Sequence, residues 1–285
     1  MKAIAAGFLA ALFALAVIPG ATVAQERAPM LVDSGWLAQH LHDANLVLLQ
    51  VGSQDDFRMA HIPGAQPVTL ADISVSGPLT LQLPPIEKLT SAFESRGISP
   101  DSEIVVYCSG NSVTPCTRVI WTLSYYGLGD RVSLLNGGLD AWRSAGNRVT
   151  SEVKTPAPGK LTPHLHPEIF ADANWILANL HKSGISLIDA RMGHSYNGDG
   201  HIPGARNIPV EELLTDSGQI KNKAAVGESF SNAGVRRGNQ VVSYCYIGQR
   251  ATLIWFLARM QGYNARVYDG SWEDWSMHHS DSIEK

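Results

Sequence analysis

The chain repeats its own sequence pattern, and this repeat limits the folds that it can adopt. The three pairs, in chain order, are HIPGA at 61–65 and 201–205, IVVYC at 104–108 and QVVSYC at 240–245, and LNGGLDAW at 135–142 and YDGSWEDW at 268–275. The spacing within a pair falls slightly along the chain, as small differences in loop length would produce. Three repeated segments in one order indicate a duplicated domain.

The length and the linker composition agree with two domains. A chain of 285 residues is long for one domain and sufficient for two, since domains commonly contain about 100 to 200 residues. A polar, Pro- and Gly-rich stretch begins at residue 151, between the two copies. We expect a first domain over residues 25–150, a linker over 151–163 and a second domain over 164–285.

Each copy alternates short apolar runs with helical patterns. The apolar runs are LVLLQV, IVVYC and VSLL in the first copy and ISLIDA, QVVSYC and ARVYD in the second. Longer stretches between them, such as TRVIWTLSYYG and RATLIWFLARMQG, have helical periodicity. This alternation predicts an α/β fold with a mainly parallel sheet and helices on both faces. In such a fold the functional loops lie at the carboxyl ends of the strands.

The first residues and the net charge bear on location and partners. Residues 1–24 have a short positive start, an apolar run over 3–18 and a small-residue end, typical of a cleaved signal peptide. The apolar run is shorter than the roughly 20 residues that span a membrane. We therefore expect a periplasmic or secreted protein, with no membrane contact after signal cleavage. The formal net charge of −4 gives no basic surface for nucleic acid.

Cys245 lies where a predicted strand meets a predicted helix. The first-turn amides of a helix have no intrahelical partners, and these amides and the helix dipole favour a thiolate. Arg250 adds a permanent positive charge, and Gly248 permits a backbone conformation that turns several N–H groups inward. A buried, inert thiol is the alternative. The surrounding residues favour a nucleophile.

These residues resemble a known family. The CxxGxR loop at 245–250, the DAR to HIPGA segment at 189–205 and the closing YDGSWEDW look like the tandem-domain rhodaneses, the thiosulfate and 3-mercaptopyruvate sulfurtransferases. The resemblance runs from about residue 30 to 276. It implies two rhodanese-like domains, each with a five-stranded parallel sheet, and a catalytic cysteine, Cys245, in the second domain only.

The resemblance also implies a mechanism and a set of site residues. The Cys245 thiolate would take sulfur from a small anionic donor as a persulfide and pass it to a thiol or cyanide, or to a protein acceptor, without a cofactor. Arg250 would steer the donor, and Arg191 either contacts substrate or pairs structurally with Asp189. The backbone amides that would cradle the sulfur belong to Tyr246, Ile247, Gly248, Gln249 and Arg250.

Departures from the family pattern bear on the donor. Tyr246, Ile247 and Ser195 stand where thiosulfate enzymes commonly have basic residues, so the donor site is less cationic. Ile247 also lacks the hydroxyl that the mercaptopyruvate enzymes carry there. Thiosulfate remains the expected donor; the alternatives are 3-mercaptopyruvate and a periplasmic persulfide carrier or redox partner with little activity alone. A related phosphatase would need five residues between cysteine and arginine, and this loop has four.

The first copy carries Cys108 at the position that matches Cys245, and Cys116 follows it. In an exported protein the two could form a disulfide that closes a short loop. They could also be a free thiol pair that relays sulfur, or unlinked structural thiols, and the sequence leaves a bond to Cys245 open. We expect structural roles for His61 and His201. We expect no metal site at the remaining histidine pairs, which are His164 with His166 and His278 with His279.

Overall fold

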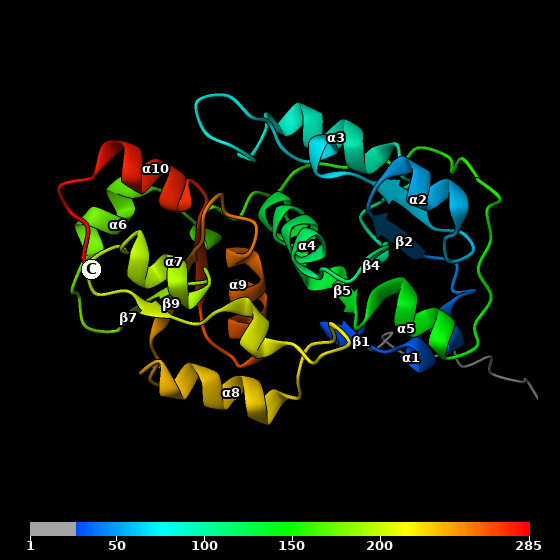
Figure 1. Cartoon of the computed structure of the whole chain (residues 1–285). Coiled ribbons are helices and arrows are strands. Elements are labelled where there is room, and N and C mark those ends of the chain that lie inside the picture. The colour runs from blue at the N-terminus through cyan, green and yellow to red at the C-terminus, as the bar shows by residue number, and fades with distance from the viewer. Residues whose placement is uncertain (1–26) are drawn as a thin grey trace, which may run out of the picture.

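The computed structural model describes residues 27–285, so the predicted signal peptide lies outside the described residues. This part of the chain forms two five-stranded parallel sheets, in the strand orders β1-β5-β4-β2-β3 and β6-β10-β9-β7-β8. The two orders are the same when the second copy is renumbered. The predicted duplication, the α/β fold and the parallel sheets are therefore confirmed (Figure 1).

The elements follow each other in the same order in both domains. The strands are β1 Leu31–Val32, β2 Leu46–Val51, β3 Gln66–Val68, β4 Glu103–Cys108 and β5 Val132–Leu135, then β6 Phe170–Ala171, β7 Ile185–Asp189, β8 Arg206–Asn207, β9 Gln240–Tyr244 and β10 Ala265–Tyr268. The α-helices are α1 Ser34–His40, α2 Gln54–Met59, α3 Ile86–Glu94, α4 Thr114–Tyr126 and α5 Gly138–Ser144, then α6 Ala173–Asn179, α7 Gly193–Gly198, α8 Lys223–Asn232, α9 Ala251–Met260 and α10 Ser271–His278.

The central strands are apolar along their length because helices cover both faces of each sheet. All residues of β4 and β9 after the first are buried. One face of the first sheet packs Phe57 of α2 and Trp142 of α5, and the matching face of the second packs Trp272 and Trp275 of α10. Continuous apolar strands are typical of parallel sheets buried on both sides.

The repeated HIPGA segments have a structural role in both domains. The N–H of Ile62 donates to the Tyr107 hydroxyl at 2.9 Å, and the N–H of Ile202 donates to the Tyr244 hydroxyl at 3.1 Å. The ring of His61 is buried and stacks on Phe57. His201 stacks in the same way on Tyr196. These contacts tie the turn to the strand that carries the cysteine, and they fit the structural roles that we expected for both histidines.

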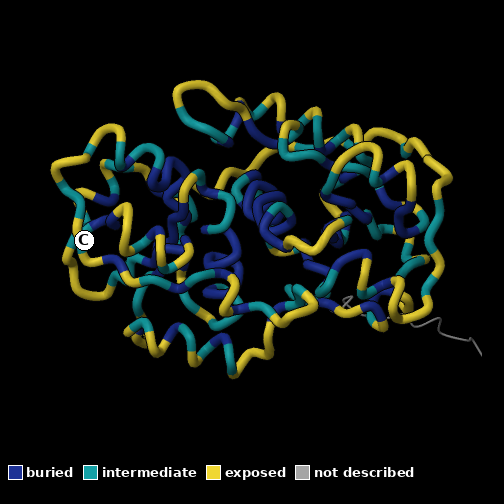
Figure 2. The backbone as a smooth tube through the Cα atoms, viewed as in Figure 1, coloured by how far each residue is buried: buried dark blue, intermediate teal, exposed yellow. Residues whose placement is uncertain are grey.

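The two domains share a core where α4 packs against α9. These helices lie side by side between the sheets (Figure 1), and their backbones are among the most buried parts of the chain (Figure 2). One continuous apolar cluster includes Trp121 of α4 and Trp255 of α9. The Cys245 loop leads directly into α9. It therefore lies at the domain interface.

Residues 151–163 contain no helix or strand and follow the surface of the first domain. Within them, the N–H of Gly159 donates to the Glu94 carbonyl at 2.8 Å, and the N–H of Leu161 donates to the Glu94 carboxylate at 2.7 Å. In residues 27–285 no helix has the length and apolar character needed to cross a membrane.

Candidate active site

Cys245 follows the carboxyl end of β9 and is buried, with 1% of its surface exposed. It is the one free cysteine among residues 27–285. Its backbone is fixed against the start of α10: the Cys245 N–H donates to the Ser271 hydroxyl at 3.1 Å, and its carbonyl accepts from the Trp272 N–H at 2.9 Å. The repeated YDGSW segment therefore holds the thiol in position.

The loop after Cys245 presents a row of free hydrogen-bond donors. Within the described chain, the backbone N–H groups of residues 246–250 donate to no protein atom. Gly248 has a φ of 79°, and a Cβ there would lie 2.7 Å from the Asp269 carbonyl. Both facts require glycine at this position. Unpaired amides beside a thiol are suited to bind a negatively charged sulfur.

Arg250 is held by an acidic residue that the sequence analysis did not identify. Its guanidinium pairs with Glu211, in the 3₁₀ turn Val210–Leu213, and its Nε donates to the Ala190 carbonyl at 3.3 Å. The Arg250 side chain keeps 28% of its surface exposed. Its charge is therefore shared between Glu211 and any anion that enters the loop.

Arg191 makes the pairing with Asp189 that we considered as one of its two roles. Its side chain is fully buried, with Nη2 2.7 Å from the Asp189 carboxylate and 2.6 Å from the Gly200 carbonyl. The guanidinium lies over the Trp272 ring at 4.2 Å. Burial alone would lower the pKa of Arg191, but the bonds to Asp189 raise it, so the group stays charged. Contact between Arg191 and a donor stays a prediction.

The other predicted loop residues point away from one another. Tyr246 is 42% exposed, and its hydroxyl donates to Asp199. The Gln249 side-chain amide instead crosses to the first domain, where it donates to the Thr114 hydroxyl at 3.0 Å. Ile247 is partly buried. The side chains of these residues therefore do not converge on Cys245, and only their backbone groups surround it.

Arg118 and Asp269 were missed as parts of this site. Arg118, on α4, is fully buried, pairs with Asp269 and donates to the Leu81 carbonyl at 2.6 Å. Its Nη1 would lie 3.0 Å from a Cβ on Gly248. Arg118 belongs to the first domain and follows the Cys108 loop in the sequence. The structure directs it across the interface to the Cys245 loop.

Cys108 and Cys116 form a disulfide, with their Cα atoms 5.8 Å apart. This geometry matches the first of the alternatives for this pair and leaves Cys245 unbonded. The bond joins the end of β4 to the first turn of α4. In the first domain, Cys108, the residue equivalent to Cys245, is therefore not a free thiol.

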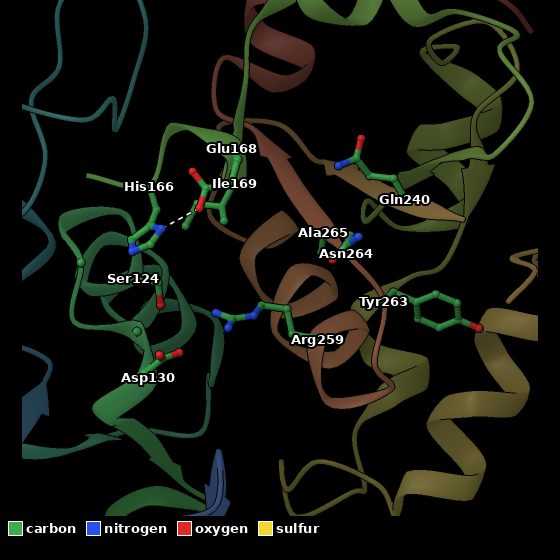
Figure 3. Close-up of a pocket in the computed structure, with 12 residues that line it drawn as sticks. Ser124, Asp130, His166, Glu168, Ile169, Gln240, Arg259, Tyr263, Asn264 and Ala265 are labelled. Atoms are coloured by element: carbon green, nitrogen blue, oxygen red, sulfur yellow. Dashed lines mark hydrogen bonds and ion pairs between the residues drawn. The ribbon is translucent and has the colours of Figure 1, made fainter. Parts of the chain in front are cut away.

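A cavity of about 460 Å³ lies away from Cys245 (Figure 3). It is lined by Gln240 and Ala265, which begin β9 and β10, so it opens at the edge opposite to the cysteine. His166 in its wall pairs with Glu168 at 2.6 Å. Residues 27–285 contain no group of three His, Cys, Asp or Glu side chains arranged to hold a metal. The cavity does not belong to the Cys245 site.

Comparison with known proteins decides the family. The model of the rhodanese-like domain matches the chain twice, over residues 33–145 and 172–278. The chain belongs to the rhodanese family. Both rhodanese domains carry the fold, and the free cysteine lies in the second.

Individual relatives cover most of this rhodanese. It is 29% identical to the thiosulfate sulfurtransferase of Azotobacter vinelandii, over 90% of this chain and 97% of the relative. It is also 29% identical to the sulfur carrier protein TtuD of Thermus thermophilus, over 86% and 93%. The crystal structure of the 3-mercaptopyruvate enzyme SseA from Escherichia coli matches with a TM-score of 0.77 at 27% identity, over 86% and 99%. The prediction of a sulfurtransferase is confirmed at the level of the family.

Proposed function

We propose that the protein is a thiosulfate sulfurtransferase that moves sulfane sulfur to cyanide or a thiol through a persulfide on Cys245. The observation that carries the proposal is the free, buried Cys245 followed by five backbone N–H groups without protein partners in the described chain. The thiosulfate relative of Azotobacter vinelandii supports the choice of donor.

The reaction has two displacement steps. In the first, the Cys245 thiolate attacks the outer sulfur of thiosulfate; a new S–S bond forms, the S–S bond of thiosulfate breaks, and sulfite leaves with the electron pair. The terminal sulfur of the persulfide carries the negative charge, which the amides of residues 246–250 stabilise. In the second, cyanide attacks that sulfur, thiocyanate leaves, and the Cys245 thiolate returns.

The test is the intact mass of the purified protein before and after thiosulfate, compared with 3-mercaptopyruvate, followed by peptide mapping. We expect one added sulfur on Cys245, which cyanide removes. A larger yield with 3-mercaptopyruvate would reassign the donor. If neither donor adds sulfur to a protein whose Cys245 reacts with a thiol reagent, the proposal is contradicted.

A persulfide carrier is the second candidate, and one observation favours it. Arg250 and Arg191 are both paired with carboxylates, so the site offers little free positive charge to a dianionic donor. The TtuD relative is named a sulfur carrier. A carrier would gain sulfur from a protein persulfide much faster than from thiosulfate, which the same mass measurement would detect.

We further propose that the protein is exported. The residues that would form its signal peptide, 1–24, have the pattern described above, and the Cys108–Cys116 disulfide suits an oxidising compartment. The amino-terminal sequence of protein recovered from the periplasm or medium tests this directly. We expect it to begin near Gln25, and an uncleaved product retained in the cytoplasm would contradict the proposal.

A further inference from the structure

We propose that the first turn of α4, tethered by the Cys108–Cys116 disulfide, is a positioning element of the first domain that sets the conformation of the Cys245 loop. The inference rests on the proposed sulfur transfer at Cys245. It assigns a part in that reaction to the first domain, whose own cysteine, Cys108, is held in a disulfide.

Two threonines of α4 hold Gln249, in the middle of the loop. The Thr114 hydroxyl accepts from the Gln249 side-chain amide at 3.0 Å. The Thr117 and Thr252 hydroxyls lie 2.9 Å apart, and the Thr252 hydroxyl donates to the Gln249 carbonyl at 2.6 Å. The Thr117 hydroxyl also lies 3.1 Å from the Thr114 carbonyl, so its one proton is shared between that carbonyl and the Thr252 hydroxyl, while the Thr252 proton is used on Gln249. Gln249 is thus fixed at its side chain and its backbone.

Arg118, the residue after Thr117, holds the two flanks of the loop. Its guanidinium pairs with Asp269 and lies against Gly248. Asp269 belongs to the segment that ends in Ser271, whose hydroxyl accepts the Cys245 N–H. The other Asp269 oxygen accepts from the N–H of Leu83, in the first domain, at 3.1 Å. The two sides of the loop are therefore fixed to α4.

The disulfide anchors the turn that makes these contacts. Cys116 lies between Thr114 and Thr117, and its sulfur is bonded to Cys108 at the end of β4. Val113 precedes the helix and provides no side-chain cap, so the first turn lacks the hydrogen bond that usually secures a helix start. The covalent bond supplies that restraint. It fixes Thr114, Thr117 and Arg118 relative to the first sheet.

Two changes test the element at different points. Cys108→Ser with Cys116→Ser removes the tether, and Thr117→Val removes one hydroxyl while keeping the shape. Thr122→Val is the matched control: Thr122 is equally buried on α4, and its hydroxyl donates only to the Arg118 carbonyl of the same helix, at 3.0 Å. All proteins are assayed without reductant, and thermal unfolding is recorded for each.

The first readout is the single-turnover rate of persulfide formation on Cys245 with thiosulfate. We expect it to fall about three- to tenfold in both test variants, the size of one lost hydrogen bond, and to change less than about twofold in Thr122→Val. The second readout is the pH profile of Cys245 alkylation by iodoacetamide. We expect this profile to shift in the test variants only, which a general loss of stability would not produce.

The outcomes separate this inference from the proposed function. Wild-type rates and profiles in both test variants would overturn it, as would an equal loss in Thr122→Val. If the wild-type protein gains no sulfur from thiosulfate, the proposed function fails, and the alkylation profiles alone decide whether α4 positions the loop.

Discussion

Cys108 and Cys245 occupy equivalent places in the two domains, yet only one is a free thiol. Each lies at the carboxyl end of a central strand and follows a buried tyrosine that accepts a hydrogen bond from the HIPGA turn. The residue before Thr117 is Cys116, and the residue before its partner Thr252 is Ala251. Cys116 closes the first position in a disulfide. The comparison shows that one residue at the start of the next helix decides the state of the thiol.

The residue that faces each cysteine differs in a related way. Gly138 and Ser271 occupy equivalent positions, with φ angles of 55° and 54°. A Cβ on Gly138 would lie 2.5 Å from the Cys108 carbonyl, so the first domain requires glycine. In the second domain the Ser271 hydroxyl accepts the Cys245 N–H. A strained left-handed serine costs about 1–2 kcal/mol, and it persists here beside Cys245.

The largest expected effect is the difference in turnover between a variant that lacks Cys245 and a variant that lacks both Cys108 and Cys116. Cys245→Ser removes the nucleophile, and we expect turnover of thiosulfate with cyanide to fall by about ten-thousandfold or more. Cys108→Ser with Cys116→Ser should retain at least about a tenth of wild-type turnover. Thiocyanate release measures both. If the folded double variant were inactive, the assignment of sulfur transfer to the second domain alone would be wrong.

The equivalent residues Asp269 and Asn136 should differ in their effect on stability. Asp269→Asn leaves the buried Arg118 charge unpaired, and we expect a loss of about 3–5 kcal/mol in the free energy of unfolding. Asn136 exchanges two hydrogen bonds with Ile220. Asn136→Asp loses one of them, at a cost of about 1–2 kcal/mol. Urea unfolding at pH 7 measures both, and equal losses would contradict the asymmetry.

The tyrosines before the two cysteines should behave alike. Tyr107→Phe or Tyr244→Phe leaves a buried N–H unpaired, which costs about 1–3 kcal/mol at pH 7.

Burial raises the pKa of both tyrosine hydroxyls, so the folded protein keeps these protons when the unfolded chain loses them near pH 10. The contribution of these hydroxyls to the free energy of unfolding is therefore complete below about pH 10 and declines as the pH rises further. Each phenylalanine variant should lose stability less steeply above pH 10 than the wild type. Urea unfolding between pH 9 and 11 measures the slope, and an unchanged slope would contradict the prediction.

The smallest expected effect concerns the charge beside Cys245. Glu211→Gln removes the carboxylate that pairs with Arg250, and we expect the KM for thiosulfate to fall about two- to fivefold, as for a partly exposed ion pair. Glu212→Gln is the control, because no ion pair of Glu212 occurs in residues 27–285. Steady-state kinetics at low salt compare the two. A higher KM in Glu211→Gln would show that Glu211 positions Arg250 rather than opposing the donor.

Local patterns determined much of this protein. The repeat, the apolar runs and the helical periodicity predicted two parallel α/β domains, because strands and helices follow from the spacing of nearby apolar residues. The place of Cys245 at a strand end followed from the same pattern. The sequence predicted an unusual backbone conformation at Gly248, and its φ of 79° lies in the left-handed region that favours glycine.

Only the tertiary structure decided which charged groups meet. Arg118 and Asp269 are 151 residues apart in the sequence and pair across the domain interface. Glu211 reaches Arg250, 39 residues away, through packing that no local pattern encodes. The choice of Cys116 as the partner of Cys108 likewise depends on where α4 begins relative to β4. The sequence by itself determined the two domains and the place of Cys245, the proposed nucleophile, because these depend on neighbouring residues. The tertiary structure decided what holds Cys245, because that depends on side chains that folding brings together.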